Sequence, residues 1–161
     1  MDTQISKQKI EFMGYLKGEG CFRLSKKEAM SRRRGWKESI MYTPVLVVAA
    51  RDDDADILKW AKDTYGGSIY HRSKPNPSSP NQKPHYIWQV TSAKVLVPIL
   101  EDFVDSSLPS KKTEQAKILL DICNLKVNVK RQATGRTWYS EEDRKLQDDA
   151  FYKLKELKQY K

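Results

Sequence analysis

The sequence predicts an α+β domain in which four mainly antiparallel strands are covered by helices on one side, so that the other sheet face is exposed. Two observations lead to this class. The 161 residues suffice for one domain with a proper core. Along them, helical and strand-like apolar patterns follow one another in the order α-β-β-α-β-β-α, with further helices appended, which is typical of an α+β architecture.

The N-terminal part of the chain is predicted to form a helix followed by two strands. From residue 5 to residue 16, apolar side chains recur at spacings that a helix gathers on one side. Residues 21–27 alternate apolar and polar side chains, which is the period of a strand with one buried and one basic face. A charged turn at 31–39 leads into residues 40–50, a strongly apolar second strand whose two faces the pattern does not distinguish.

A second helix and two more strands follow. Residues 52–67 begin with aspartates and end with glycines, which are conventional start and stop signals of a helix. Residues 67–74 and 85–91 have the composition of strands. The segment between them, residues 75–84, is rich in proline and polar residues and is predicted to be a loop without structure of its own.

The C-terminal part is predicted to be helical. Residues 92–104 and 108–125 are apolar at helical spacing and complete a core domain that we expect over residues 1–125. Residues 126–161 form a basic linker and a last amphipathic helix, for which Ser140 is the expected N-cap.

Charge and composition narrow the function classes. Basic residues outnumber acidic ones by 30 to 21, for a net charge of +9, which favours a nucleic-acid partner over a merely soluble basic protein. Cys21 and Cys123 have no metal-binding spacing. No apolar run reaches the ~20 residues of a membrane span, and the N-terminus lacks a secretion signal. We expect a protein of the cytoplasm, or of an organelle matrix if it is organelle-encoded, that is not secreted. We also expect that it does not bind a membrane and has no small-molecule substrate.

The exposed sheet face is the predicted binding surface. On each strand, the residues opposite the apolar set carry donors suited to phosphates and to base edges in a major groove. The alternative is that each charge is simply solvated. The predicted DNA-binding residues are Arg23, Ser25, Lys27, Ser68, Tyr70, Arg72, His85 and Gln89 on the strands, and Arg32, Arg33, Arg34 and Lys74 in the turn and the loop.

The stretch EFMGYLKGEGCF, residues 11–22, places three glycines, Gly14, Gly18 and Gly20, around the carboxylate of Glu19. Gly14 and Gly18 are four residues apart, so they lie on one side of the helix, where another backbone could approach closely. Contact between two such helices brings two Glu19 carboxylates together, which is unfavourable unless a cation lies between them. Hard oxygen ligands of this kind suit Mg²⁺.

Residues 12–20, FMGYLKGEG, resemble the nine-residue motif of the LAGLIDADG homing endonucleases. The resemblance implies a saddle-shaped antiparallel sheet that lies on double-stranded DNA. It implies that Glu19 and the adjoining Gly18 bind the catalytic metal, and that Gly14, Gly18 and Met13 lie at the interface between paired motif helices. Because the chain has one copy of the motif, the resemblance also implies a homodimer.

The resemblance suggests two further catalytic residues and shows two departures. The family's basic residue near the active site best matches Lys112, with Lys111 as the competing choice. A polar residue at the end of the second strand often orders the attacking water in the family, and Arg51 is the nearest candidate, although a shift of one residue would put Ala50 there. Lys17 stands where the family often has its first aspartate, and residues 12–13 replace the usual Leu-Ala.

The expected function is that of a site-specific homing endonuclease. It would cleave double-stranded DNA at a long, nearly palindromic site by metal-dependent hydrolysis, with Mg²⁺ as the cofactor. One alternative is a protein that uses the same scaffold to bind nucleic acid without cutting it, either an intron RNA maturase or a DNA-binding regulator. A plain structural α+β domain is the third possibility.

Overall fold

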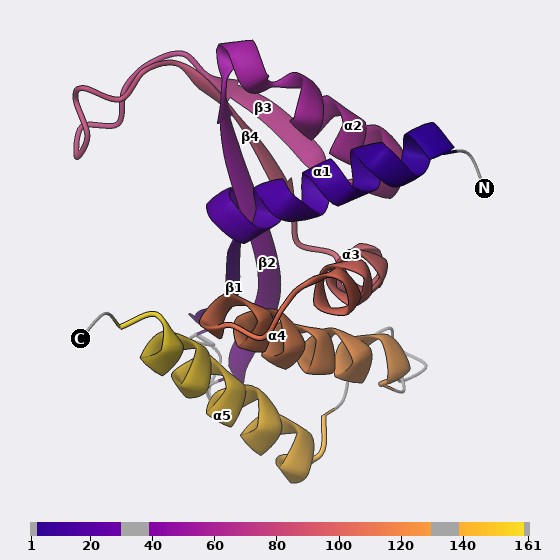
Figure 1. Cartoon of the computed structure of the whole chain (residues 1–161). Helices are drawn as coiled ribbons and strands as arrows, with labels where there is room; N and C mark the ends of the chain where they lie inside the picture. Colours follow the sequence, from indigo (N-terminus) through magenta and orange to yellow (C-terminus); the bar gives the residue numbers. More distant parts are fainter. Residues whose placement is uncertain (1–2, 30–38, 130–138, 160–161) are drawn as a thin grey trace.

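A computed structural model describes residues 3–29, 39–129 and 139–159 of the chain (Figure 1). Its elements follow the predicted α-β-β-α-β-β-α order with two more helices after it, which confirms the expected fold class. They are α1 (Thr3–Glu19), β1 (Cys21–Ala29), β2 (Ser39–Arg51), the 3₁₀ turn η1 (Asp52–Asp54), α2 (Asp56–Tyr65), β3 (Ser68–Arg72), β4 (His85–Val90), α3 (Ala93–Ser106), α4 (Lys111–Asn128) and α5 (Glu141–Leu157).

The strands form one four-stranded antiparallel sheet in the order β1-β2-β4-β3. The long strand β2 pairs with β1 through residues 39–47 and with β4 through residues 46–51. Because side chains alternate between the two faces of a strand, this register assigns every residue to one of two faces. We call them the core face, which the helices cover, and the open face.

The core lies between the core face and the helices. Phe22, Leu46 and Trp88 of the sheet are fully buried, and they belong to one hydrophobic cluster with side chains of α1 to α5. In Figure 1, α1 and α4 both cross β2 on the viewer's side. The predicted arrangement of a sheet covered on one face is therefore confirmed.

Helix α1 contributes to this core with a narrower face than its sequence suggests. Phe12, Met13 and Leu16 are at most 5% exposed, whereas Ile10 is 71% exposed and does not join them. Ile10 is one of the apolar residues between positions 5 and 16 that were expected on one side of this helix, so for Ile10 this expectation is wrong. A residue four positions before Gly14 lies on the same side of the helix as that glycine, which is the side away from the core.

The helix ends at a glycine that sterics require. The Gly20 amide donates to the Leu16 carbonyl oxygen at 2.8 Å. A Cβ atom added at Gly20 would lie 2.6 Å from that same oxygen, a distance that backbone atoms cannot relieve cheaply. Only glycine therefore lets the chain leave α1 and enter β1 within one residue.

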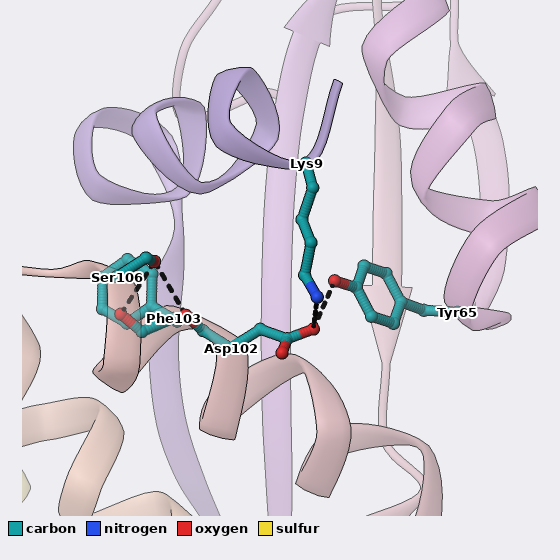
Figure 2. Close-up of polar contacts among 5 residues, drawn as sticks. All are labelled: Lys9, Tyr65, Asp102, Phe103 and Ser106. Atoms are coloured by element: carbon teal, nitrogen blue, oxygen red, sulfur yellow. Dashed lines mark hydrogen bonds and ion pairs between the residues drawn. The ribbon is translucent and has the colours of Figure 1, made fainter. Parts of the chain in front are cut away.

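A polar cluster joins the N-terminal half of α1 to α2 and α3 (Figure 2). Asp102 of α3 forms an ion pair with Lys9 of α1 at 3.0 Å and accepts a hydrogen bond from the Tyr65 hydroxyl of α2 at 2.8 Å. Burial, followed by the hydrogen bond to Asp102, raises the pKa of Tyr65. Gln8 of α1 accepts a further bond from the Trp60 indole at 3.0 Å. These contacts fix α1 against the domain.

The C-terminal helices begin at caps. Ser110 precedes α4 and accepts the Thr113 amide, while Ser140 and Asp143 form a capping box at the start of α5, as expected for Ser140. The predicted boundary between residues 125 and 126 falls inside α4, which continues to Asn128. Among the described helices, none is long and apolar enough to cross a membrane.

Candidate functional site

The C-terminal end of α1 is where the predicted site residues meet. Glu19 is the last residue of the helix and is exposed. Lys112, in the first turn of α4, donates a hydrogen bond to the Gly18 carbonyl oxygen at 3.5 Å. Its neighbour Lys111 is exposed and makes no hydrogen bond or ion pair with the described residues. Of the two competing lysines, the structure therefore places Lys112 beside the end of α1.

The ammonium group of Lys112 has an unusual environment. Partial burial lowers the pKa of Lys112, because the charged form loses contact with water. Cys21 and Glu19 oppose this effect and raise the pKa, while the positive charge of Lys158 lowers it. Lys112 is thus a half-buried cation close to a carboxylate, a thiol and a second cation.

That second cation comes from the end of the chain. The Lys158 ammonium, directly after α5, donates to the Cys21 sulfur at 3.8 Å, across 137 residues of sequence. Sequence reasoning missed both residues. No periodicity or motif marks them, since only the docking of α5 brings Lys158 to the start of β1.

Tyr15 is another residue at this end of α1 that sequence reasoning missed. Its hydroxyl donates to the Ala49 carbonyl oxygen of β2 at 3.0 Å. Burial, and then the negative charges of Glu19 and Asp54, raise the pKa of Tyr15. This contact attaches the last turns of α1 to the end of β2, the strand that carries Arg51.

The register of β2 resolves the choice between Ala50 and Arg51. Ala50 pairs with Tyr86 and is 4% exposed, so it lies on the core face. Arg51 pairs with His85, lies on the open face and is exposed. Arg51 is therefore the residue whose side chain solvent can reach at the end of β2, and its proposed role in ordering water stays a prediction.

The open face carries most of the predicted DNA-binding side chains. The register places every second residue of each of the four strands on this face. Six of the predicted DNA-binding residues lie there and are exposed, namely Arg23, Ser25, Lys27, Ser68, Tyr70 and Arg72. Gln89 lies on the same face but is half-buried. Lys74, in the loop after β3, is exposed, and Arg32, Arg33 and Arg34 lie outside the described residues.

Two details of this face differ from the prediction. His85 lies on the open face by register, yet it is only 7% exposed and its Nδ1 atom is 2.9 Å from the Lys83 carbonyl oxygen. It offers little surface to a ligand, because this local contact holds the ring against the backbone. Conversely, Met41 pairs with Lys27, is 56% exposed and adds an apolar side chain that the ambiguous pattern of the second strand did not assign.

The outer side of α1 has open space beside its glycines. Apart from its chain neighbours and the backbone of its own helix, a Cβ atom added at Gly14 or Gly18 meets no atom within 4 Å. Met13, also predicted at a dimer interface, is 5% exposed and packs in the core of its own chain, so it is corrected to a core residue. Ile10 takes its place on the outer side.

A single chain offers few ligands for a metal. Among the described residues there is no group of three or more His, Cys, Asp or Glu side chains that could hold a metal ion. At the end of α1, the chain contributes the exposed Glu19 carboxylate and the Gly18 carbonyl oxygen, which are both hard oxygen donors. These donors fit Mg²⁺ in chemistry, and a second copy would double their number.

The fold defines a class of protein: a four-stranded antiparallel sheet with an open face, bordered by a helix that ends in a carboxylate. By sequence, no family model and no curated protein matches the chain. Solved structures do match it, among them three homing endonucleases in complex with DNA.

The archaeal intron-encoded homing endonuclease I-Vdi141I, complexed with DNA, has a TM-score of 0.67 and 20% identity, over 98% of this chain and 89% of that chain. I-CvuI, in complex with a DNA target, has a TM-score of 0.64 and 17% identity, over 99% and 87%. The group I intron-encoded I-CeuI, with DNA, gives 0.60 and 19% over 76% of this chain but only 56% of its own length. The fold is that of the LAGLIDADG homing endonucleases, as predicted.

Proposed function

We propose that the chain is a homodimeric homing endonuclease that cleaves double-stranded DNA at a long, nearly palindromic site by metal-dependent hydrolysis of phosphodiesters. The observation that carries this proposal is the contact of Lys112 with the Gly18 carbonyl, which places a cation next to the Glu19 carboxylate at the end of the motif helix. This approach of a cation to a carboxylate, without a direct ion pair, occurs in a fold shared with endonucleases solved on DNA.

The open face supports DNA as the substrate. Its exposed arginines, lysines, serines and tyrosine present donors to a duplex, and the net charge of +9 favours a polyanion. An antiparallel sheet can enter a major groove and read base edges there. Arg23 and Arg72, on the outer strands β1 and β3, are suited to bidentate contacts with guanine.

The outer side of α1 supports a dimer. Ile10 and Gly14 form an apolar strip with room for a second backbone, because neither residue has a partner in the core of its own chain. Two copies of α1 packed along this strip would bring two Glu19 carboxylates together. The dimer then has two-fold symmetry, and its DNA site is expected to share that symmetry.

Glu19 and the Gly18 carbonyl of each subunit would hold Mg²⁺, in line with the Mg or Ca in which I-CvuI was crystallised with DNA. When bound, the metal would polarise the phosphate and make a bound water more acidic. Lys112 would donate to a phosphate oxygen and stabilise the charge that develops on it. Arg51 would orient the attacking water from the end of β2.

Selection from a randomised duplex library tests this function, since the target sequence then need not be chosen in advance. We expect the wild-type chain to cut both strands of nearly palindromic members, and only when Mg²⁺ is added. Glu19→Gln should bind the same sequences while its cleavage rate falls on the order of 10²- to 10³-fold. Glu101→Gln, which neutralises an exposed carboxylate on α3, is the matched control and should cut normally.

Three other results would each point elsewhere. Normal cutting by the Glu19 variant would remove this carboxylate from the mechanism. Enrichment of bound but uncut sequences by the wild type would favour a maturase or a regulator. A salt series that shows no DNA affinity even at low ionic strength would leave only a structural role.

A further inference from the structure

We propose that Lys158 is a phosphate-binding residue of the nuclease site, so that α5 supplies a second cation to the scissile region. This inference rests on the proposed function and assigns part of that site to the C-terminal tail. The ligand is the DNA backbone, and the group that binds it is the Lys158 ammonium beside Cys21.

The position of Lys158 follows from the way α5 docks. Leu154 is 3% exposed and belongs to the hydrophobic core, and Lys158, four residues later, continues the same side of the helix. Asp148, earlier in α5, accepts a hydrogen bond from Tyr42 of β2 and lies 3.9 Å from Lys26 of β1. These contacts hold α5 across β1 and β2, which leaves the end of α5 near the start of β1.

The sulfur that Lys158 contacts belongs to the site. Cys21 is exposed, lies two residues after Glu19 and shares the open face with Arg23, since the register pairs Cys21 with Val47 and Arg23 with Val45. Lys112 contacts Gly18, directly before Glu19. Two ammonium groups therefore flank the four-residue segment that contains the catalytic carboxylate.

These two cations have no direct ion-pair partner among the described residues, although the charge of Glu19 acts on Lys112 from nearby. Neither Lys112 nor Lys158 forms an ion pair with a carboxylate among the described residues. Their acceptors are a carbonyl oxygen at 3.5 Å and a thiol at 3.8 Å, both long contacts. Two converging positive charges are unfavourable unless an anion approaches both, and a DNA phosphate at the edge of the open face has that charge.

Lys158 also has a simpler role to exclude. It caps the end of α5, where the helix dipole favours a positive charge. A lysine that acts only through this dipole stabilises the helix and has no effect on the number of counterions released by DNA. The salt dependence of DNA binding therefore separates the two roles, whereas stability alone does not.

The first experiment compares Lys158→Gln, Lys158→Arg and the matched control Lys155→Gln, an exposed lysine on the same helix. The affinity of each protein for a short duplex is measured by fluorescence anisotropy over a salt series. The salt slope is the slope of the logarithm of the association constant against the logarithm of the salt concentration. We expect Lys158→Gln to reduce its magnitude by about 0.9 for each phosphate that a subunit no longer neutralises. Lys158→Arg should keep the wild-type slope, and Lys155→Gln should change it much less. Equal slopes for the two glutamine variants would overturn the proposal.

The second experiment uses the cysteines of the wild-type protein and requires no variant. A maleimide labels the exposed Cys21, while the buried Cys123 serves as an internal reference. Saturating duplex should slow the labelling of Cys21 several-fold, because the proposal places the backbone over Lys158 and Cys21. Unchanged labelling in a sample that binds duplex would refute the role of Lys158 and leave the proposed function standing, whereas absence of binding would refute the proposed function itself.

Discussion

Charged groups are paired at the N-terminal half of α1, whereas at its C-terminal end they converge without being paired. At the first, Asp102 receives both Lys9 at 3.0 Å and the Tyr65 hydroxyl at 2.8 Å. At the second, Lys112 reaches only a carbonyl oxygen at 3.5 Å, and Glu19 is exposed with no ion pair among the described residues. We call the N-terminal half of α1 its saturated end, because its charged groups are paired, and the C-terminal end its unsaturated end, because its charged groups are not.

The difference assigns stability to one end and chemistry to the other. A paired carboxylate such as Asp102 is stabilised by its partners and has little capacity left for a ligand. Charges held close together without partners cost stability, and such groups concentrate at functional sites. The saturated end therefore fixes the helix, and the fixed helix holds Glu19 in place for a substrate. Substitutions at each end test this assignment, because those at the saturated end should change stability and those at the unsaturated end should change cleavage.

The largest effect is expected from Gly14→Leu. Gly14 lies on the outer side of α1, in the part of the helix that precedes the unsaturated end. Because an added Cβ meets nothing in its own chain beyond its own helix, the monomer should stay folded while two helices can no longer approach. Loss of the dimer would separate the two Glu19 carboxylates and abolish cleavage. Sedimentation velocity measures the dimer, and Gly14→Ala should give a graded, smaller loss. An unchanged dimer in the leucine variant would contradict the helix-pair arrangement.

The second prediction concerns Lys112→Gln. If Lys112 stabilises charge on the phosphate, its loss should lower the single-turnover cleavage rate on the order of 10²-fold. Lys111→Gln removes the same charge from the neighbouring exposed position and should have a small effect. A larger loss in the Lys111 variant would reverse the assignment that the contact with Gly18 supports.

The fold was predictable because its signals are local. Apolar periodicity, glycines and proline-rich loops each act over a few residues, and they define the element order before any tertiary contact is considered. Glu19 and Lys112 were predicted as site residues because a short motif and its resemblance pointed to them, and their catalytic roles stay predictions. The cap at Ser140 was likewise readable from the residues that follow it.

What the sequence could not predict depends on packing between distant segments. Ile10 and Met13 are both apolar residues of α1, and only the position of the sheet decides that one is exposed and the other buried. The polarity of His85 suggested an open position, but a backbone carbonyl two residues away holds its ring in a buried one. Lys158 reaches Cys21 only after α5 has docked, so no local pattern could indicate it.

A smaller effect is expected from Tyr65→Phe, at the saturated end. The variant loses one hydrogen bond to a carboxylate, which should lower the free energy of unfolding by about 1–3 kcal/mol. Thermal unfolding should record this as a lower midpoint, by about 2–4 °C per kcal/mol. Tyr152→Phe is the matched control, since that hydroxyl makes no hydrogen bond within the described parts of the chain.

The cleavage rate measured below the unfolding transition should be unchanged in Tyr65→Phe. The reason is that Tyr65 helps to hold the helix without touching the site. A variant that unfolds at the same temperature as the wild type, or that loses cleavage while folded, would break the division between the two ends of α1.

The smallest effect is a difference in alkaline stability between the wild type and Tyr65→Phe. Burial and Asp102 raise the pKa of Tyr65 above its ordinary value of 10.0, so the folded state keeps a proton that the unfolded state releases. The contribution of this hydroxyl is therefore fully present below about pH 10 and declines as the pH rises above it, by at most about 1.4 kcal/mol per pH unit. Denaturant unfolding from pH 8.5 to 11 measures the decline.

The ammonium of Lys9 pairs with the same Asp102 carboxylate, so the contribution of this ion pair must be separated from that of the Tyr65 hydroxyl. The comparison is therefore repeated in a Lys9→Met background. If Tyr65 titrates as its environment indicates, the difference in free energy of unfolding between the tyrosine and phenylalanine proteins should narrow with rising pH in both backgrounds. A gap that stays constant to pH 11 would show that Asp102 does not hold the Tyr65 proton, and that the saturated end of α1 is less tightly coupled than its distances imply.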